Sequence, residues 1–310
     1  MSEHRCGYVA LVGRPNAGKS TLLNRILGTK LAITSAKPQT TRHRIAGIHN
    51  EEGIQAVLVD TPGIHDGWTE LNKSMVKRAL GVLGEVDLIL WVGDMTALAR
   101  SAEAGIDPLD ETDRMIAARC AEASAPVLFV ANKIDVIPRP LLLPVIDAVQ
   151  KALPVAAAVP VSALTGDGVP QLLNEVTSRL PVGPALFPPD EWAQVTERFL
   201  VAELVREKVF HLTEQEVPYA THVEVRDFDE SQREDRGLVR IFADIVVERD
   251  SQKGIVIGKR GEMLKRIGTL ARTELVEVLG ARVYLKLFVR VEPDWTRSTR
   301  GLRRVGYDDS

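Results

Sequence analysis

A glycine-rich stretch near the N-terminus has the residue types and spacing of a phosphate-binding loop. From Gly13 to Ser20 the chain reads GRPNAGKS, which matches G-x-x-x-x-G-K-[ST]. Glycines let backbone N–H groups approach phosphate oxygens, and the N-terminus of a following helix favours their negative charge. The Lys19 ammonium suits the β- and γ-phosphates, and the Ser20 hydroxyl suits Mg²⁺. The expected nucleotide contacts here are Gly13, Arg14, Pro15, Asn16, Ala17, Gly18, Lys19, Ser20 and Thr21.

A second segment indicates which base is bound. Asn132-Lys133-Ile134-Asp135 follows an apolar run, Val127 to Ala131. Guanine presents N–H donors at N1 and N2, which the Asp135 carboxylate would accept, whereas adenine presents an acceptor at N1. Sites that hydrogen-bond one substrate reject the analogue that leaves their polar groups unpaired. We therefore predict guanine contacts from Asn132, Lys133 and Asp135, backed by Ser162, Ala163 and Leu164.

Two polar segments complete a magnesium and γ-phosphate site. Asp60-Thr61-Pro62-Gly63 ends an apolar strand, where Asp60 is predicted to hold Mg²⁺ through water and the Gly63 amide to sense the γ-phosphate. Thr40-Thr41 lies in a polar loop, and we expect Mg²⁺ and γ-phosphate to order residues Ile33 to Arg44. The predicted metal set is Ser20, Thr41 and Asp60. The predicted catalytic set is Asn16, Lys19, Thr41 and Gly63, and the nucleotide set also includes Thr61, Pro62 and Ile64.

The residue after Gly63 departs from a common catalytic arrangement. Many GTPases place a glutamine there to orient the attacking water. In this chain the position holds Ile64, which cannot form hydrogen bonds through its side chain. Slow intrinsic GTP hydrolysis is therefore expected.

The elements that position these residues alternate along the first 180 residues. Apolar runs at 7–13, 54–60, 86–92, 127–131 and 155–161 read as buried strands. Helical patterns separate most of them, for example at 19–27, 113–122 and 169–180. This alternation predicts an α/β domain with a mainly parallel sheet, and the runs at 43–48 and 54–59 predict an antiparallel hairpin at its edge. The Ala-rich stretch from Asp94 to Pro108 shows neither a clear helix nor a clear loop pattern.

The segment PVGPALFPP, residues 181–189, separates two regions of different pattern. Its prolines remove backbone donors, so we read it as a semi-rigid linker. After it the order helix, strand, strand, helix, turn, helix, strand predicts a smaller α+β domain. The predicted boundaries are 1–180 for the GTPase domain, 181–194 for the linker, 195–296 for the second domain and 297–310 for a C-terminal tail.

The second domain carries a candidate RNA site. Gly258-Lys259-Arg260-Gly261 is a GxxG loop between two helical patterns, the arrangement with which a type II KH domain clamps about four nucleotides. Residues Ser251 to Gly306 contain 13 Lys and Arg against 5 Asp and Glu, although the whole chain has a net charge of -3. The predicted RNA-binding residues are Gly258, Lys259, Arg260, Gly261, Lys265, Arg266, Arg282, Lys286 and Arg290.

Taken together, GRPNAGKS, PQTTRHRI (residues 38–45), DTPGI, NKID, SALTGDG and the GKRG module resemble the Era family of bacterial GTPases. The resemblance covers nearly the whole chain. It implies that GTP and Mg²⁺ are bound, that GTP is hydrolysed to GDP, and that the 3′ end of 16S ribosomal RNA is bound during assembly of the small (30S) ribosomal subunit. It also implies a cytoplasmic protein with peripheral inner-membrane association. In the wider TrmE-Era group an Asn at the position of Asn16 accompanies K⁺, which makes K⁺ a further candidate cofactor.

Other classes of function are excluded or left open by the composition and motifs. Two cysteines, Cys6 and Cys120, exclude a disulfide-dense scaffold, and no apolar run or signal peptide suggests a membrane span or secretion. A monomer is expected. A P-loop kinase is disfavoured by NKID, and a TrmE-like modification GTPase by the lack of a cysteine near the C-terminus. A non-catalytic RNA scaffold that binds nucleotide structurally stays open because of Ile64.

Overall fold

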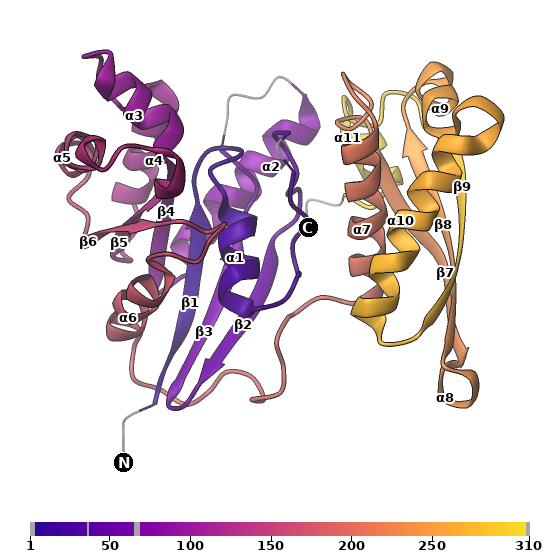
Figure 1. Ribbon diagram of the computed structural model, residues 1–310, viewed down its shortest axis with the longest axis horizontal. Coiled ribbons are helices and arrows are strands. Elements are labelled where there is room, and N and C mark those ends of the chain that lie inside the picture. The colour runs from indigo at the N-terminus through magenta and orange to yellow at the C-terminus, as the bar shows by residue number, and fades with distance from the viewer. Residues whose placement is uncertain (1–3, 36, 65–68, 308–310) are drawn as a thin grey trace. The chain divides into compact units, whose positions relative to one another are not determined.

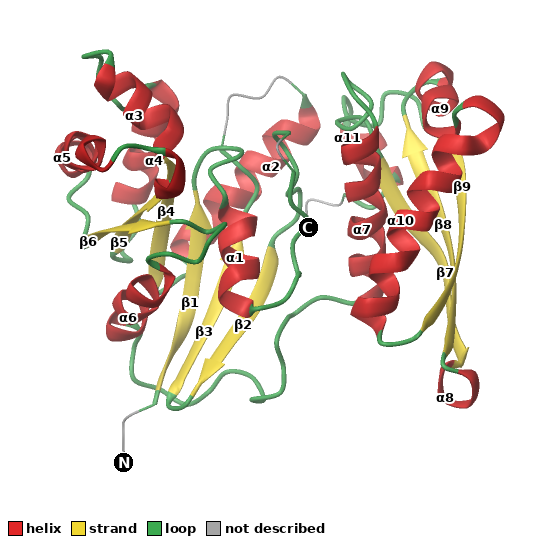
Figure 2. Cartoon of the chain, viewed as in Figure 1, coloured by secondary structure: helices red, strands yellow, loops and turns green. Residues whose placement is uncertain are grey.

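The computed structural model describes residues 4–35, 37–64 and 69–307. They belong to two compact units, which comprise residues 1–66 with 75–194 and residues 67–74 with 195–310. Each unit contains its own β-sheet and its own set of helices (Figures 1 and 2). In the described residues, no helix is both long enough and apolar enough to cross a membrane.

The first unit is built on a six-stranded sheet with the order β2-β3-β1-β4-β5-β6. Its strands are β1 (Arg5–Val12), β2 (Ile45–Glu51), β3 (Ile54–Asp60), β4 (Leu88–Asp94), β5 (Val127–Asn132) and β6 (Ala157–Val161). All neighbours pair in parallel except β2 and β3, which form an antiparallel hairpin at the sheet edge. The predicted mainly parallel sheet with an antiparallel edge is confirmed.

Helices lie on both faces of this sheet, which is why the strands are apolar throughout. The helices are α1 (Lys19–Leu27), α2 (Glu70–Gly81), α3 (Met95–Glu103), α4 (Glu111–Ala121), α5 (Leu142–Ala152) and α6 (Val169–Arg179), with short 3₁₀ turns η1 (Val82–Gly84), η2 (Ile134–Val136) and η3 (Arg139–Leu141). Of α2, residues 75–81 belong to this unit. One core joins α2, α3, α4 and α5 to the sheet around Trp91 and Phe129, whose rings meet edge to face at 5.3 Å. Figure 1 shows α1 and α6 in front of the strands.

The Ala-rich stretch after β4 contains helix α3, which the residue pattern did not predict. Asp94 begins the helix, because its side chain accepts a hydrogen bond from the Thr96 N–H at 3.0 Å. Leu98 is buried, and the Cβ of a side chain at Gly93 would lie 2.6 Å from the Phe129 ring. The apolar face of α3 thus completes the core beside β4 and β5.

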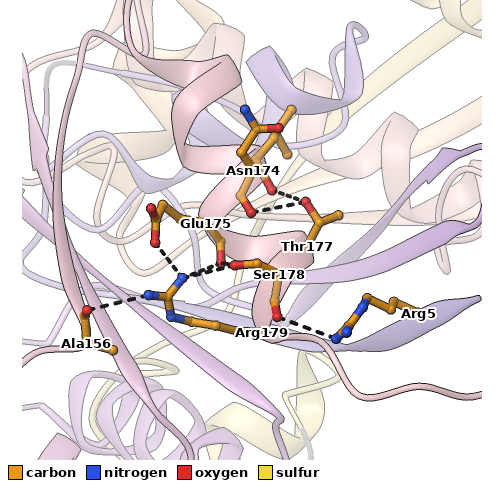
Figure 3. Close-up of polar contacts among 8 residues, drawn as sticks. Arg5, Ala156, Asn174, Glu175, Thr177, Ser178 and Arg179 are labelled. Carbon is orange, nitrogen blue, oxygen red and sulfur yellow. Dashed lines mark hydrogen bonds and ion pairs between the residues drawn. The ribbon is translucent and has the colours of Figure 1, made fainter. Parts of the chain in front are cut away.

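Arginines bind the carbonyl groups at the C-terminus of α6 (Figure 3). Arg179 donates to the Glu175 carbonyl at 2.9 Å and to the Ala156 carbonyl, just before β6, at 3.5 Å. Arg5 of β1 donates to the Ser178 carbonyl at 3.4 Å. The Ser178 carbonyl lies in the last turn of α6, where carbonyl groups have no partner within the helix, so Arg5 satisfies it. Together the three bonds connect α6 to β1 and to the residue before β6.

The proline-rich segment is not a free linker, because hydrogen bonds hold it to the edge of the first sheet. We call residues 186–194 the strap. Gln55 of β3 is 1% exposed, and its Oε1 accepts from the backbone N–H groups of Leu186 and Phe187 at 2.7 and 3.0 Å. Farther along, the Ile48 N–H of β2 donates to the Trp192 carbonyl at 2.8 Å. The prediction of a semi-rigid spacer missed this anchoring.

The second unit has a three-stranded sheet with the order β7-β8-β9, in which β7 and β8 are antiparallel and β8 and β9 parallel. The strands are β7 (His222–Gln232), β8 (Leu238–Val247) and β9 (Arg282–Val291), and the helices are α7 (Glu197–Leu212), α8 (Arg233–Arg236), α9 (Asp250–Ile257), α10 (Glu262–Leu279) and α11 (Thr299–Arg304), with a turn η4 (Lys259–Gly261). Helices α7, α9 and α10 bury one face of the sheet. The predicted order of elements is confirmed, with α8 as an added turn of helix.

The C-terminal segment packs within the second unit as far as Tyr307. The Trp295 and Tyr307 rings stack at 5.8 Å with an interplanar angle of 16°, and both side chains are buried. The Trp295 indole N–H donates to the Ala220 carbonyl at 2.9 Å. The predicted tail at 297–310 therefore begins as an ordered part of this unit's core.

Candidate nucleotide and RNA-binding sites

The loop from Gly13 to Ser20 connects β1 to α1 and leaves no room for side chains at its glycines. A Cβ at Gly13 would lie 2.3 Å from the Val92 carbonyl oxygen, and one at Gly18 would lie 2.2 Å from the Asn132 amide nitrogen. Both glycines, and Asn16, have positive φ. The glycines predicted to allow backbone approach to phosphate are thus also required by the packing of β4 and β5 behind the loop.

Lys19 crosses the loop from the first turn of α1. Its ammonium donates to the carbonyl oxygens of Gly13 at 3.0 Å and Arg14 at 2.8 Å. Burial lowers the pKa of Lys19 to about 8, and the charge of Asp60 acts in the opposite direction. A buried cation held by two carbonyl groups is electrostatically suited to bind the oxygens of a phosphate chain.

The three side chains predicted to hold magnesium converge at one point. Ser20 Oγ lies 2.6 Å from Asp60 Oδ2, and Thr41 Oγ1 lies 2.8 Å from Ser20 Oγ and 3.1 Å from Asp60 Oδ2. Asp60 is fully buried, which raises the pKa of its carboxyl group, while Lys19 and the two hydroxyls lower it. Its Oδ1 accepts no hydrogen bond among the described residues. Hard oxygen donors around a buried carboxylate fit Mg²⁺.

Asn132 connects two loops instead of standing free beside a base. Its amide Nδ2 donates to the Ala17 carbonyl at 2.7 Å, and its Oδ1 accepts from the Ala163 N–H at 2.9 Å. The side chain is 2% exposed. Asn132 thereby holds the phosphate-binding loop against the Ser162–Leu164 loop, a role that the guanine prediction did not include.

The other predicted base contacts are placed differently from one another. Asp135 lies in η2 and is exposed, so its carboxylate is open to a base. The hydroxyl of Ser162 is buried and accepts from the Thr165 N–H at 3.1 Å, which makes it a turn-forming group. Leu164 is 69% exposed. Of this segment, Ala163 is the residue that is connected to the nucleotide loop, through the Asn132 side chain.

Three ion pairs at the site, formed by Lys133 and Arg14, were missed by sequence reasoning. Lys133 Nζ lies 2.6 Å from a carboxylate oxygen of Asp94, where β4 ends. Arg14 pairs with Asp110 and, at 3.2 Å, with Asp113 at the start of α4. These partners are separated by 39 to 99 positions, and only the adjacent ends of β4 and β5 bring the first pair together.

Ile64 does not face the nucleotide cavity. Its side chain is 1% exposed within the core of the first unit, and its N–H donates to the Gly13 carbonyl at 3.1 Å. The cavity has a volume of about 410 Å³ and is lined by Lys19, Ser20, Thr41, Gly63, Lys133 and Asp94, together with the loop residues Ile33, Thr34, Ser35, Gln39 and Thr40. The inclusion of Ile64 among the nucleotide contacts therefore has no support from its side-chain position.

The GxxG loop joins α9 to α10 in the second unit. Gly258 has φ 72°, and a Cβ there would lie 2.6 Å from Cβ of Met263. Lys259, Arg260, Lys265 and Arg266 surround the loop and the first turns of α10, are exposed, and form no ion pair within the described residues. The glycines allow an RNA backbone to come close to the loop, and cations without ion-pair partners can bind its phosphates. A phosphate-binding loop requires both features.

The other predicted RNA-binding cations lie on a different face of the same unit. On β9, Leu285, Leu287 and Val289 pack beneath the helices. Arg282, Lys286 and Arg290 alternate with them, so they point to the face of the sheet opposite α9 and α10. The structure thus divides the predicted RNA-binding residues into two groups.

Comparisons with known proteins agree with this architecture. Residues 8–133 match the family described as 50S ribosome-binding GTPase, and residues 216–296 match the KH domain family. GTPase Era of Geobacter metallireducens is 52% identical over 309 residues, covering 99% of this chain and all of that protein. GTPase Era of Syntrophus aciditrophicus is 46% identical over 305 residues, covering 98% of this chain and 96% of that protein.

Two solved structures resemble the whole chain. Era in complex with MgGDPNP and nucleotides 1506–1542 of 16S ribosomal RNA has a TM-score of 0.90 and 40% identity, covering 98% of this chain and 99% of that one. A variant of Aquifex aeolicus Era bound to GDP and AlF₄⁻ has a TM-score of 0.86, 40% identity and the same coverage. With a P-loop GTPase unit followed by a KH unit, and with full-length relatives at about half identity, the chain belongs to the Era family of GTPases.

Proposed function

We propose that this protein is a GTP-hydrolysing switch that binds 16S ribosomal RNA near its 3′ end through its KH unit and acts in assembly of the small ribosomal subunit. The strongest support for the nucleotide half is the convergence of Ser20, Thr41 and Asp60 within 3.1 Å of one another beside Lys19. Support for the RNA half comes from the GxxG loop and from the relative solved with 16S RNA nucleotides.

The residues of the first unit divide the work on GTP. Lys19 and the loop N–H groups would bind the β- and γ-phosphates, and Asp135 would accept the N1 and N2 hydrogens of guanine. Ser20, Thr41 and Asp60 would hold Mg²⁺, which neutralises charge on the transferred phosphoryl group when it is bound. Because Thr41 lies in the loop after α1, nucleotide binding would order that loop.

Intrinsic hydrolysis would be slow, because no side chain at position 64 can orient the attacking water. Asn16 has positive φ and lines the cavity, where an oxygen ligand for K⁺ would be useful. Equal turnover in Na⁺ and in K⁺ would contradict a role for K⁺. Peripheral association with the cytoplasmic face of the inner membrane and a monomeric state belong to the same proposal.

RNA crosslinking in cells, followed by sequencing of the attached RNA, tests the RNA half. Wild-type protein should give reads concentrated at the 3′ end of 16S ribosomal RNA. Gly258→Asp places a carboxylate and a Cβ where the chain has no space, so the reads should be lost. Gly183→Asp adds the same charge at a glycine with open surroundings and should leave them unchanged. Diffuse reads, or reads unaffected by Gly258→Asp, would refute the RNA assignment.

GTP turnover tests the nucleotide half separately. Purified protein should release phosphate from GTP with Mg²⁺, and Ser20→Ala should abolish release because it removes a hydroxyl 2.6 Å from Asp60. Absence of turnover in wild-type protein, with K⁺ and RNA supplied, would instead support a scaffold that binds nucleotide structurally.

A further inference from the structure

The outer face of the KH sheet carries a stripe of alternating cations and aromatic rings along β9. From Arg282 the outward residues are Arg282, Tyr284, Lys286, Phe288 and Arg290, and we call this set the β9 stripe. Tyr284 is 48% exposed and Phe288 is 42% exposed. Such exposure is unusual for large aromatic side chains in a chain with only 5% aromatic residues.

Neighbouring side chains hold the two rings in place. Phe242 of β8 packs against Tyr284 with ring centroids 6.0 Å apart, and the Lys286 ammonium lies 5.2 Å from the centroid of the Phe288 ring. β9 is an edge strand, so the stripe runs along one edge of the sheet. Each ring therefore contacts a neighbouring side chain, is partly exposed and lies beside positive charge.

The charges of the stripe fall into two groups. Arg290 is engaged by Glu224 at 2.8 Å and by Asp244 at 3.5 Å. Arg282 and Lys286, which flank Tyr284, form no ion pair with a carboxylate among the described residues. Cations without carboxylate partners beside open aromatic faces complement a ligand that has both phosphates and flat bases.

We propose that the β9 stripe is a second single-stranded RNA site, in which Tyr284 and Phe288 stack on bases while Lys286 and Arg282 contact phosphates. It is separate from the GxxG loop, because α9 and α10 pack on the opposite face of the sheet. Stacking on aromatic residues of an open sheet is an established mode of RNA recognition in other folds. The inference rests on the proposed RNA function and extends it from one site to two.

Fluorescence anisotropy with two RNA lengths separates the two sites. The longer probe is a labelled RNA of about 12 nucleotides with the 3′-terminal sequence of 16S ribosomal RNA. The shorter probe is the segment of about four nucleotides within it that wild-type protein binds best, because a GxxG loop clamps about four nucleotides. The full-length variant Tyr284→Ala/Phe288→Ala should bind the longer RNA at least about 25-fold more weakly, since each stacked base contributes at least about fivefold. Its affinity for the short RNA should stay unchanged.

Control variants keep the test specific. Both rings are close to half exposed, so their truncation should lower the melting temperature only slightly and leave the protein folded at the assay temperature. Tyr284→Phe keeps the stacking surface and should keep the affinity. Val276→Ala truncates an apolar side chain of similar exposure on α10 and should have no effect. Lys286→Ala should lower the slope of log Kd against log salt by about 0.7, the value for one phosphate contact on a single strand.

Each other outcome has a definite meaning. If the double variant binds the longer RNA as tightly as wild type while Gly258→Asp loses both RNAs, the β9 stripe is not an RNA site and the KH function stands. If the double variant loses both lengths equally, the two faces are not separate sites and the proposal is refuted. If wild-type protein binds neither RNA, the proposed RNA function and this inference both fail.

Discussion

Replacing Asn132 should damage the nucleotide site without changing which base it selects. The side chain makes two buried hydrogen bonds, to the Ala17 carbonyl at 2.7 Å and from the Ala163 N–H at 2.9 Å. Asn132→Ala removes both and leaves two buried backbone groups unpaired. At about 1–3 kcal/mol for each, the variant should lose about 2–6 kcal/mol of local stability.

Base selection should depend on Asp135 instead. Its carboxylate is exposed, and we propose that it accepts the N1 and N2 hydrogens of guanine. Asp135→Asn replaces an acceptor pair with an amide that can donate to the 2-carbonyl of xanthine, so the preference should move from GDP to XDP. Asn132→Ala should weaken GDP, IDP and XDP by the same factor, because it loosens the loop that binds the phosphates they share.

Hydrogen–deuterium exchange and nucleotide titration measure these two effects. Exchange of peptides from β5 and β6 reports the opening of this region alone, which avoids treating two units as one transition. Competition against a fluorescent GDP analogue gives the affinities for the three nucleotides. If Asn132→Ala alters the ratio of GDP to XDP affinity, or leaves exchange unchanged, Asn132 reads the base directly and its role as a connector between loops is wrong.

Three further predictions concern titration and anchoring. Because burial lowers the pKa of Lys19 to about 8, GDP affinity should be level below that pH and fall by up to about tenfold per pH unit above it, which a titration from pH 6.5 to 9.5 would measure. Burial raises the pKa of Asp113 from 3.8 to about 6, so the carboxyl group loses its proton at a lower pH in the unfolded state than in the folded state. The free energy of unfolding should therefore fall as the pH rises from about 4 to about 6, and Asp113→Asn should remove that fall in thermal melts. Gln55→Leu removes the acceptor of the Leu186 and Phe187 N–H groups, and limited proteolysis should then cut the strap at least several times faster than in wild type.

The residue pattern predicted what local chemistry determines. The glycine spacing of the phosphate loop, the apolar runs of the strands and the GxxG turn are each encoded within about ten residues, and the structure has them where expected. Helix α3 was missed because its Ala-rich sequence carries a weak pattern, although Asp94 followed by Thr96 is a helix-start signal that could have located it.

Contacts between distant residues were beyond the reach of that reasoning. Nothing local to Lys133 indicates Asp94 as its partner, and nothing local to Gln55 indicates that it anchors Leu186. The alternation on β9 correctly placed Lys286 on the polar face of its strand. The face of the sheet that is covered by α9 and α10 depends on how these helices pack, which the local pattern does not determine. The predicted RNA-binding residues were therefore given as one set, whereas the structure divides their cations between two faces.

The strap gives the nucleotide site a mechanical connection to the chain that leads into the KH unit. Thr41, bonded to Ser20 and Asp60, precedes the first residue of β2 by only four positions. β2 in turn holds the strap, through Ile48 to the Trp192 carbonyl and through the Ala46 carbonyl to the Gln194 N–H at 2.9 Å. A displacement of Thr41 on nucleotide exchange would therefore act on β2. The free edge of this short strand holds Trp192 and Gln194, which lie shortly before α7. Since the strap is bonded at both Gln55 and β2, it would transmit that displacement instead of absorbing it, as a flexible linker would.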